Sequence, residues 1–519
     1  MPTIWINDKE VTVPDGTTIL QAARRQGIDI PTMCYRKGLE PQTSCFVCVV
    51  KVAGRDNLAP SCATQAVEGM RIYTESDEVR EARRVALELL LSDHAGDCVA
   101  PCHTGCPADM NIPLMIRQIA EGKLDDAIRT VKADIPLPGV LGRVCPAPCE
   151  KACRRNQRDQ AVSIMLLKRY VADADMAESL PYTPKRASSS GKRVAVVGAG
   201  PCGLSAAYYL LIRGHAPVVF EARSQLGGEL RYSVDADALP REVLDAEIKA
   251  IENMGAEFRT GVTVGEDVSL AELESEYDAV VYAAGKTSAE QANAFGLATS
   301  RFGVHIEQGS YRTSKDDIFA GGEAIRPCGK MSVRAMQQGK EIAAAIDQYL
   351  GGSEPTGIPK KMSTHIGKLQ DDEMARFMEG VNPSSRQQPE DDRGLSDKAA
   401  KIESARCLHC ECLKPDNCKL RDYSDEYDAK PSRYRGGRRL FERQYTPADV
   451  VYESGKCIAC GLCVRITEEH KQDLGLTFVG RGFQVQVAVP FDRELGKALA
   501  GVADECVEAC PTAALAYRK

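Results

Sequence analysis

Residues 193–211 read RVAVVGAGPCGLSAAYYLL, a short apolar run that leads into closely spaced glycines and then a helical pattern. The apolar run predicts a buried strand, and Gly198, Gly200 and Gly203 form the pattern G-x-G-x-x-G at the turn into a helix. Glycines at these positions let the backbone approach a pyrophosphate at the helix N-terminus. Glu221, at the end of the next predicted strand, supplies a carboxylate for a ribose hydroxyl pair. The segment therefore predicts an α/β domain that binds a dinucleotide.

Three segments downstream indicate which dinucleotide is expected. They read LGGEL at 226–230, YAAG at 282–285 and IFAGGE at 318–323, and their succession resembles the FAD motifs of the glutamate synthase small subunit family. The resemblance implies that FAD is the cofactor. It also implies that Glu323 faces the ribityl and phosphate region, where the family usually has Asp, and that a helix over 332–346 points at the isoalloxazine end. The predicted cofactor-binding residues are Gly198, Gly200, Pro201, Gly203, Glu221, Gly227, Gly228, Gly285, Gly322, Glu323 and Ser332.

The same family carries a second Rossmann unit, for NADPH, inside its FAD domain. In this chain about 33 residues lie between Gly285 and Phe319, and they contain no second glycine fingerprint. A doubly wound nucleotide domain is far longer than this. We therefore expect the chain not to bind nicotinamide as these relatives do, so that its flavin exchanges electrons through clusters, a partner subunit or another site.

Cysteine is unusually frequent, with 21 residues in a chain of 519. A protein in a reducing compartment does not keep so many cysteines for disulfides, so metal ligation is the expected role. Cys202 and Cys328 stand alone and are interpreted as small buried apolar residues, and Cys506 is surplus to its group. The predicted metal ligands are Cys34, Cys45, Cys48, Cys62, His94, Cys98, Cys102, Cys106, Cys145, Cys149, Cys153, Cys407, Cys410, Cys412, Cys418, Cys457, Cys460, Cys463 and Cys510.

The N-terminal cysteines have the spacing C-x10-C-x2-C-x13-C. A close pair with outlying ligands is typical of a [2Fe-2S] ferredoxin, and a four-cysteine structural zinc is the alternative. Residues 1–98 resemble the N-terminal region of the large iron-sulfur subunit of complex I and of its relatives among [FeFe] hydrogenases and formate dehydrogenases. The shared text is GTTIL at 16–20, Cys45-x2-Cys48, EGM at 68–70 and LLLS-x-H at 89–94. The resemblance implies a plant-type [2Fe-2S] cluster and a docking region for an NADH-oxidising partner.

The central cysteines follow directly. His94-x3-Cys98 occupies the place of a histidine that ligates a [4Fe-4S] cluster in the same family, and a structural histidine is the alternative. Beyond Cys98, the segments APC-x3-CP at 100–107 and GRVCPAPC-x3-C at 142–153 resemble the N-terminal domain of the glutamate synthase small subunit and dihydropyrimidine dehydrogenase. This second resemblance implies two interlocked [4Fe-4S] clusters.

The ligand sets that the second resemblance implies are Cys98, Cys102 and Cys153, with His94 as the candidate that completes them, and Cys106, Cys145 and Cys149. The family's fourth ligand to the second cluster is a Glu or Gln. The matching residue here is Lys168, whose ammonium group cannot ligate iron. Either a nearby group such as Gln160 substitutes, or the second cluster is altered or absent.

Two further cysteine groups lie near the C-terminus. Cys407-x2-Cys410-x-Cys412-x5-Cys418 places four thiolates in twelve residues, which suits a [4Fe-4S] cluster or zinc. Cys457-x2-Cys460-x2-Cys463 is the three-cysteine loop of a bacterial ferredoxin, and Cys510-Pro511 supplies the fourth thiolate of one [4Fe-4S] cluster. The segments VGRGF at 479–483 and PTAAL at 511–515 resemble the ferredoxin-like part of formate dehydrogenase and hydrogenase large subunits, without the catalytic domain that follows there.

The predicted fold class is multidomain, α/β and α+β. Residues 3–13 alternate around Asn7-Asp8 as a hairpin, with a helix over 18–26 and another over 76–91. Two polar linkers are expected, at 181–192 and roughly 352–400. The predicted domains are a β-grasp [2Fe-2S] ferredoxin-like domain at 1–92, a helical [4Fe-4S] domain at 93–185, a Rossmann-like FAD domain without an NADPH insert at 190–352, and a C-terminal [4Fe-4S] ferredoxin-like region at 400–519.

Charge and motif content limit the function. Lys plus Arg total 66 against 73 for Asp plus Glu, a formal net charge of -7, and no dense basic run suggests a nucleic-acid partner. No signal peptide and no apolar stretch of about 18 residues is found, so we expect a cytoplasmic protein without a membrane span. No hydrolytic triad, paired acid/base carboxylates or zinc-hydrolase motif appears, and no catalytic residue is assigned.

The leading hypothesis is an oxidoreductase subunit that transfers electrons through one [2Fe-2S] cluster, three to four [4Fe-4S] clusters and FAD. Its expected partners are an NAD(P)H-oxidising flavin subunit and a reductase, hydrogenase or formate dehydrogenase subunit. One alternative is a self-sufficient FAD-dependent oxidoreductase that acts directly on NAD(P)H or a small substrate. A redox-sensing or scaffolding subunit is the other.

Overall fold

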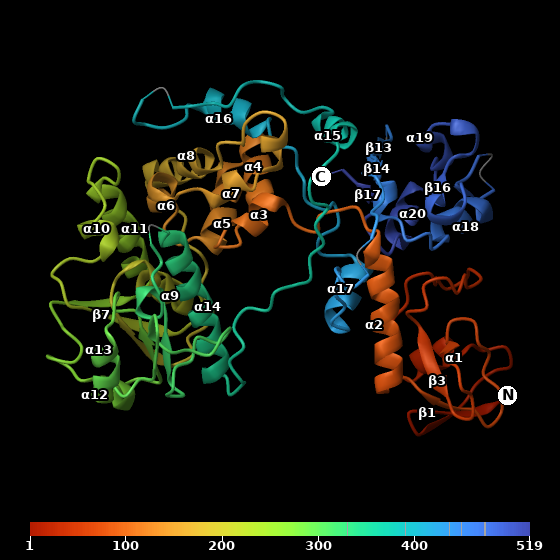
Figure 1. Ribbon diagram of the computed structural model, residues 1–519, viewed down its shortest axis with the longest axis horizontal. Coiled ribbons are helices and arrows are strands. Elements are labelled where there is room, and N and C mark those ends of the chain that lie inside the picture. Colours follow the sequence, from red (N-terminus) through yellow and green to blue (C-terminus); the bar gives the residue numbers. More distant parts are fainter. Residues whose placement is uncertain (330, 390, 435, 448, 472–473, 519) are drawn as a thin grey trace. The chain divides into compact units, whose positions relative to one another are not determined.

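The computed structural model describes residues 1–519 apart from 330, 390, 435, 448, 472–473 and 519 (Figure 1). The chain forms two compact units, and each contains segments that are far apart in the sequence. The first unit comprises Met1–Ala100, Lys361–Glu379 and Cys410–Lys519. The second unit comprises Pro101–Lys360 and Gly380–His409. The second unit is therefore inserted, in the sequence, between parts of the first.

The first unit begins with a five-stranded sheet of order β2-β1-β5-β3-β4. Its strands are β1 (Thr3–Ile6), β2 (Lys9–Thr12), β3 (Val49–Val52), β4 (Ala59–Pro60) and β5 (Arg71–Tyr73). Strands β1 and β2 form the predicted hairpin, and both Asn7 and Asp8 at its turn have positive φ. Helix α1 (Ile19–Arg25) starts at Thr18, whose side chain and that of Gln21 cap each other's backbone N–H groups.

Helix α2 (Asp77–Ser92) leads from this sheet to the first central cysteine group. It starts at Ser76, whose hydroxyl accepts a hydrogen bond from Val79 N, as the sequence predicts. The remaining helices of the unit are α15 (Asp371–Met378), α17 (Lys419–Glu426), α18 (Leu462–Glu469), α19 (Leu495–Ala498) and α20 (Ala503–Ala509). Its C-terminal strands are β13 (Gln444–Tyr445), β14 (Val450–Tyr452), β15 (Thr477–Val479), β16 (Gln486–Ala488) and β17 (Leu515–Tyr517).

The second unit contains the predicted α/β domain. Its five-stranded sheet is parallel throughout, in the order β12-β9-β6-β7-β8. The strands are β6 (Arg193–Val197), β7 (Ala216–Glu221), β8 (Glu257–Thr260), β9 (Ala279–Tyr282) and β12 (Ile318–Ala320). Helix α14 (Ser332–Leu350) packs closely against α9 (Pro201–Ile212) at Gly339, where an added Cβ would lie 2.3 Å from the carbonyl oxygen of Cys202. This is the Rossmann-like arrangement that the glycine fingerprint predicts.

Helices build the rest of the second unit, as expected for the region after residue 98. They are α3 (Pro101–Gly105), α4 (Ile112–Ala120), α5 (Leu124–Asp134), α6 (Pro138–Val144), α7 (Pro148–Lys151), α8 (Ile164–Ala177) and α16 (Asp397–Ser404). Among the contacts that join them to the α/β domain, Tyr208 donates a hydrogen bond to Lys132 O, and Lys340 forms an ion pair with Asp134. Among the described residues no helix is both long enough and apolar enough to cross a bilayer.

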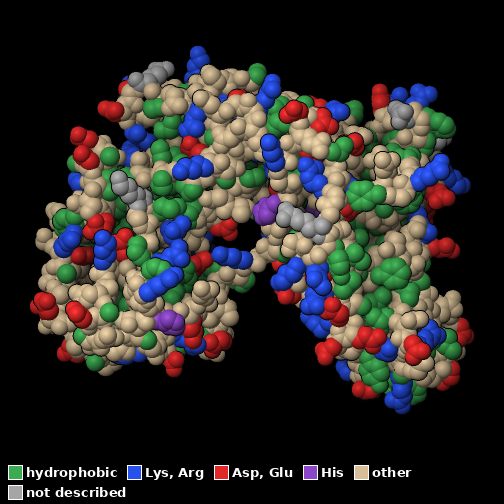
Figure 2. Space-filling view, viewed as in Figure 1, with side chains coloured by type: hydrophobic (Ala, Val, Ile, Leu, Met, Phe, Trp, Pro, Cys, Tyr) green, Lys and Arg blue, Asp and Glu red, His purple; other side chains and the backbone are tan. Residues whose placement is uncertain are grey.

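The structure differs from the sequence prediction at the second linker. The segment expected to connect domains at 352–400 contains α15 and the start of α16, and parts of it belong to each unit. Thr364, for example, donates a backbone hydrogen bond to the sulfur of Cys98. Polar composition suggested a linker, but the polar groups are used in packing. On the face that Figure 2 shows, side chains of both charges are interspersed, as the nearly balanced composition requires.

Glu247 is a buried carboxylate that joins the α/β domain to the helical part of the second unit. It lies on α11 (Arg241–Asn253) and accepts hydrogen bonds from Gly139 N at 2.6 Å and Val140 N at 2.9 Å, at the start of α6. Burial raises its pKa to about 7, although the two backbone N–H groups oppose the shift. The folded state therefore binds an extra proton between the unfolded pKa, about 4.5, and pH 7.

We predict that this proton makes the wild-type protein lose stability as pH rises from 5 to 7. Glu247→Gln stays neutral, so the variant is expected to gain stability relative to wild type over that window, by roughly 3 kcal/mol at most. Thermal unfolding of both proteins at several pH values measures the difference. Glu242→Gln, an exposed change on the same helix, is the control and should follow the wild-type profile. Parallel curves for wild type and Glu247→Gln would contradict the prediction.

Candidate redox centres

The four N-terminal cysteines come together as predicted. Cys34, Cys45, Cys48 and Cys62 are all buried, and the sulfur atoms of Cys34 and Cys45 are 3.4 Å apart. The hydrogen bond with Cys45 lowers the pKa of Cys34 to about 5, and the bond with Cys62 lowers the pKa of Cys48 to about 7. The same bonds raise the pKa of Cys45 and of Cys62. Four thiolates this close repel one another unless bound iron compensates their charge, so the group fits a cluster.

Each tight cysteine loop contains a residue with left-handed backbone. Phe46 (φ 53°) lies between Cys45 and Cys48, His409 (φ 44°) precedes Cys410, and Ala459 (φ 51°) precedes Cys460. Non-glycine residues rarely adopt this conformation, and it occurs mostly at functional turns. In the third loop it directs Ala459 N toward the sulfur of Cys457, at 3.4 Å. The sequence analysis missed these three residues; the C-x2-C spacing was their only signal.

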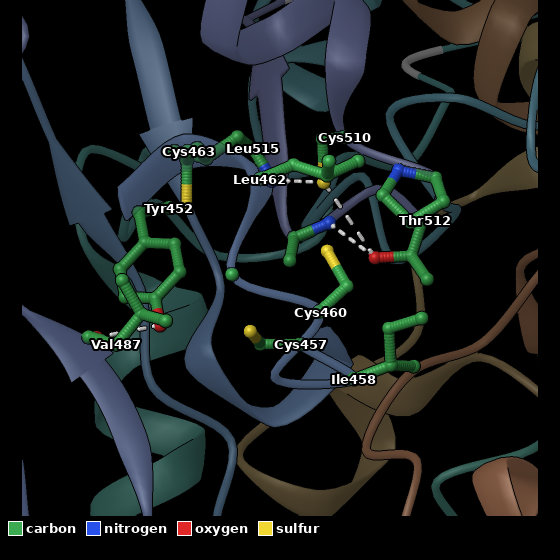
Figure 3. Close-up of a pocket in the computed structure, with 13 residues that line it drawn as sticks. Tyr452, Cys457, Ile458, Cys460, Leu462, Cys463, Val487, Cys510, Thr512 and Leu515 are labelled. Atoms are coloured by element: carbon green, nitrogen blue, oxygen red, sulfur yellow. Dashed lines mark hydrogen bonds between the residues drawn. The ribbon is translucent and has the colours of Figure 1, made fainter. Parts of the chain in front are cut away.

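A cavity in the first unit is lined by the predicted C-terminal ligand set. The sulfur atoms of Cys457, Cys460, Cys463 and Cys510 face a common space (Figure 3). Leu515 N points at the sulfur of Cys510, at 3.5 Å, and the hydroxyl of Thr512 lies 3.7 Å from the same sulfur. Cys506 is buried in the apolar core beside this cavity. The four thiols thus enclose a space, with a backbone N–H directed at one of them, which is the environment that a [4Fe-4S] cluster requires.

A second cavity in the first unit has a lining that the sequence analysis did not anticipate. It is lined by His94, Cys98, Cys412 and Cys418, together with Asp97, Lys414, Pro415, Arg421 and Ala513. Cys412 N donates to Cys98 O at 3.4 Å, and this bond holds the two segments together. The prediction had placed Cys98 with Cys102 and Cys153, and Cys412 and Cys418 with Cys407 and Cys410. Spacing along the chain misled it, because more than 300 residues separate Cys98 from Cys412.

The chemical state of His94 suits this second cavity, which we call the His94 cavity. Burial and the ammonium group of Lys456 lower the pKa of His94 to about 4. The imidazole is therefore neutral at pH 7, which is the form that binds metals. Within the described residues no three His, Cys, Asp or Glu side chains are arranged to hold a single metal ion. Four cysteines line the Figure 3 cavity, and three cysteines and His94 line the His94 cavity.

The second unit groups the other cysteines in two places. Cys153 is half-buried; its burial is the main cause that raises its pKa, and the nearby Cys407 adds to the rise. Helix α3, which carries Cys102, lies directly against the residue before Cys153: an added Cβ at Gly105 would lie 2.6 Å from the Ala152 Cβ. Cys407 therefore lies near Cys153 in the second unit, although the prediction had grouped it with Cys412 and Cys418.

Cys106, Cys145 and Cys149 form the other group in the second unit, as predicted. Burial raises the pKa of Cys106 and raises that of Cys149 to about 12, while the charge of Lys168 opposes both shifts. Lys168 is itself buried, so an ammonium group faces the position where relatives have an acidic or amide ligand. Gln160, the proposed substitute, has an exposed side chain, and Arg406 binds its backbone oxygen.

The dinucleotide fingerprint has the geometry that its glycines predict. Gly203 contacts the preceding turn so closely that an added Cβ would lie 1.9 Å from Gly198 O, and Gly198 itself has φ 98°. Helix α9 has no side-chain cap at Gly200, so its first N–H groups are free of a side-chain acceptor there. The Glu221 carboxylate accepts hydrogen bonds from Ala199 N at 2.8 Å and Arg223 N at 3.0 Å, which fix it beside the turn.

The remaining predicted cofactor residues surround the same end of the sheet. Gly228 lies close to Gly200: a Cβ added at Gly228 would lie 2.8 Å from the Gly200 Cα. Gly227, Gly285 and Gly322 have positive φ, Glu323 follows β12 in a short 3-10 helix, Pro201 starts α9 and Ser332 starts α14. Cys202 and Cys328 are buried, as interpreted from the sequence, and Cys202 packs against Gly321 and Gly322. The residues fit a bound dinucleotide, because side chains are absent where the backbone must approach it.

The segment between β9 and β12 is short and irregular. It contains α13 (Ala289–Ala294) and a hairpin of two-residue strands, β10 (Thr299–Ser300) and β11 (Gly303–Val304). All of it lies in the described part of the chain. Its elements do not form a βαβ unit.

Three protein-family models match successive, partly overlapping stretches of the chain. Residues 1–77 match the 2Fe-2S iron-sulfur cluster binding domain. Residues 64–180 match dihydropyrimidine dehydrogenase domain II, 4Fe-4S cluster. Residues 151–347 match the pyridine nucleotide-disulphide oxidoreductase domain. The resemblances expected from the sequence motifs are thereby confirmed.

Curated relatives include three kinds of subunit. The chain is 37% identical over 233 residues to the NADP(+)-dependent formate dehydrogenase subunit beta of Moorella thermoacetica, covering 41% of this chain and 32% of that protein. It is 40% identical over 190 residues to the NADPH-Fe(3+) oxidoreductase subunit beta of Geobacter sulfurreducens, covering 36% and 28%. It is 38% identical over 195 residues to the glutamate synthase [NADPH] small chain of Mycobacterium tuberculosis, covering 37% and 40%.

The matched stretch thus spans about a third of the length of these relatives. Each of the three is an oxidoreductase subunit or chain by name. Successive stretches of the chain therefore match a 2Fe-2S domain, a 4Fe-4S domain of the dihydropyrimidine dehydrogenase type and a pyridine nucleotide-disulphide oxidoreductase domain, and the chain is similar to glutamate synthase small chains and formate dehydrogenase beta subunits.

Proposed function

We propose that this chain is the electron-transfer subunit of a cytoplasmic oxidoreductase complex. It relays electrons between an NAD(P)H-oxidising flavin subunit and a reductase, hydrogenase or formate dehydrogenase subunit, through [2Fe-2S], [4Fe-4S] and FAD centres. The named relatives, which are subunits of formate dehydrogenase, NADPH-Fe(3+) oxidoreductase and glutamate synthase, support the partner classes.

One observation carries this proposal: a single apolar core touches ligands of three candidate clusters. Cys34 and Cys45 of the [2Fe-2S] group, Cys418 of the His94 cavity and Cys460 of the Figure 3 cavity all belong to it. The other buried members are Met33, Val47, Leu87, Leu91, Leu420, Tyr427, Ala429 and Leu462. Centres whose ligands share one dry core are close together and screened from water, as a relay requires. A hydrolase or a scaffold has no use for this arrangement.

The geometry supports four ligand sets besides the [2Fe-2S] group. In the first unit they are His94, Cys98, Cys412 and Cys418, and Cys457, Cys460, Cys463 and Cys510. In the second unit we propose Cys102, Cys153 and Cys407 as one set, and Cys106, Cys145 and Cys149 beside Lys168 as the other.

The finer fold assignments belong to the same proposal. The N-terminal sheet, with one antiparallel hairpin, a parallel β1–β5 pair and α1, supports a β-grasp ferredoxin domain at 1–92. The cysteine triad before α18 and Cys510 after α20 support a ferredoxin-like segment within 400–519. The helical [4Fe-4S] and FAD domains are proposed at 93–185 and 190–352.

The regrouping of ligands predicts which cysteine variants behave alike. Cys98→Ser and Cys412→Ser should each remove the same [4Fe-4S] signal, and about four iron atoms per chain, because both line the His94 cavity. Cys407→Ser should remove a different signal. Electron paramagnetic resonance and iron analysis of anaerobically purified full-length protein measure these losses. Cys506→Ser, a buried thiol outside the four sets, is the control and should lose no cluster. If Cys407→Ser and Cys412→Ser remove the same signal, the result would instead support one cluster on Cys407, Cys410, Cys412 and Cys418, as their spacing predicts.

A second prediction separates a relay subunit from a self-sufficient enzyme. The segment from Gly285 to Phe319 lacks a second glycine-rich turn before a helix N-terminus, which is what binds a nicotinamide dinucleotide in related domains. NADH and NADPH should therefore leave the flavin of the isolated chain oxidised in stopped-flow absorbance, whereas dithionite reduces it. Addition of the NAD(P)H-oxidising partner should restore reduction.

The control for this experiment is Gly203→Ala. It should purify without flavin but with its clusters, because the added Cβ would lie 1.9 Å from Gly198 O. Rapid and saturable reduction of the wild-type flavin by a nicotinamide alone would instead favour the self-sufficient enzyme.

A further inference from the structure

We propose that Lys456 is a positioning residue that raises the reduction potential of the cluster in the His94 cavity. The inference rests on the proposed function, since it assumes that His94, Cys98, Cys412 and Cys418 hold a cluster. Lys456 immediately precedes Cys457, the first ligand of the neighbouring set. Its backbone therefore belongs to one centre, while its side chain extends toward the other.

The side chain of Lys456 covers the turn that carries His94 and Cys98. An added Cβ at Gly96 would lie 2.6 Å from Lys456 Cε, 3.2 Å from its Cγ and 3.4 Å from His94 Nε2. Ala95 N donates to Gly455 O at 2.8 Å and fixes this turn against the segment before Lys456. Because Gly96 has no side chain, the lysine stem can lie flat on the turn. The ammonium group is thereby brought near His94 and Cys412, two residues that line the His94 cavity.

The ammonium group of Lys456 is buried and belongs to an ion-paired group with Glu453 and Arg443. Its ammonium donates to one carboxylate oxygen of Glu453, and the guanidinium of Arg443 binds the other oxygen at 2.7 Å. Glu453 and Lys456 are both buried, and Arg443 is nearly so. Two cations and one carboxylate leave a net charge of +1 in this group. In a dry environment such a charge acts strongly on a neighbouring centre.

The same residue connects the two cavities of the first unit. Thr512 donates from its hydroxyl to Lys456 O at 3.0 Å and lies 3.7 Å from the sulfur of Cys510, as Figure 3 shows for Thr512 and Cys510. Ala513, the next residue, lines the His94 cavity. The backbone of Lys456 thus contacts Thr512, which lines the Figure 3 cavity, while its ammonium group acts on His94 and Cys412, which line the His94 cavity. A fixed positive charge there stabilises an added electron on the cluster it faces, so the one-electron reduction of that cluster becomes easier.

The test is a redox titration of full-length protein, followed by electron paramagnetic resonance with dithionite as reductant. The signal of the His94 cavity is the one that Cys418→Ser lacks. Lys456→Met removes the charge and keeps the length of the side chain, so the midpoint potential of that signal should become more negative. Lys456→Arg keeps the charge and should restore a potential near that of wild type. The [2Fe-2S] signal in the same samples is the internal control and should not move.

Each outcome has a defined meaning. An unchanged potential in Lys456→Met, or equal shifts in the Met and Arg variants, would overturn the inference. If Lys456→Met does not assemble the cluster, Glu453→Gln decides: loss of the carboxylate should shift the potential to more positive values, and no shift or the opposite shift would overturn the inference. If Cys418→Ser removes no signal that the wild-type protein shows, the proposed cluster site is refuted instead.

Discussion

The His94 cavity depends on a long-range closure of the chain. Three of its lining residues come from 94–98 and four from 412–418, and the hydrogen bond from Cys412 N to Cys98 O joins these segments directly. The chain between residues 98 and 412, which includes the whole second unit in the sequence, must therefore begin and end close to this hydrogen bond. The apolar core that touches three candidate clusters contains Cys418 and Leu420, so it also depends on this closure. Loss of the contact between these two segments would open the His94 cavity and would also separate the three candidate clusters from one another.

Burial of many sulfur atoms makes their thiolate form unfavourable, and positive charges close to the sulfur atoms offset this effect. Thiols in a dry core resist ionisation, and burial raises the pKa of Cys418, for example, to about 12. Bound iron offsets this cost, because a coordinated thiol is deprotonated by the metal. Buried lysines add positive charge nearby: Lys168 stands beside Cys106 and Cys149, and Lys456 near Cys412. The same placement of an ammonium group recurs in each unit, on unrelated elements.

Much of the fold could be predicted from the sequence because the signals are local. The strand, glycine turn and helix of 193–211, the Asn7-Asp8 hairpin and the Ser76 cap each involve neighbouring residues, and all three appear as expected. The four-cysteine sets at Cys34 to Cys62 and at Cys457 to Cys510 also assemble as predicted. The structure departs from the predicted grouping where cysteines from distant segments come together. Twelve residues that contain four cysteines suggested one cluster, yet Cys407 lies near Cys153 and Cys412 lies near Cys98.

The interleaving of the two units has a consequence for biosynthesis. His94 and Cys98 leave the ribosome more than 300 residues before Cys412, which at 5–20 residues per second corresponds to roughly 15 to 60 seconds. The cysteines of the [2Fe-2S] group are complete by residue 62 and can receive their cluster during this interval. Cys98, by contrast, waits as an unliganded thiol until the distal segment is made. With the proposed ligand sets, cluster delivery is therefore ordered in time, and the His94 cavity can be filled only after Cys418 has been synthesised.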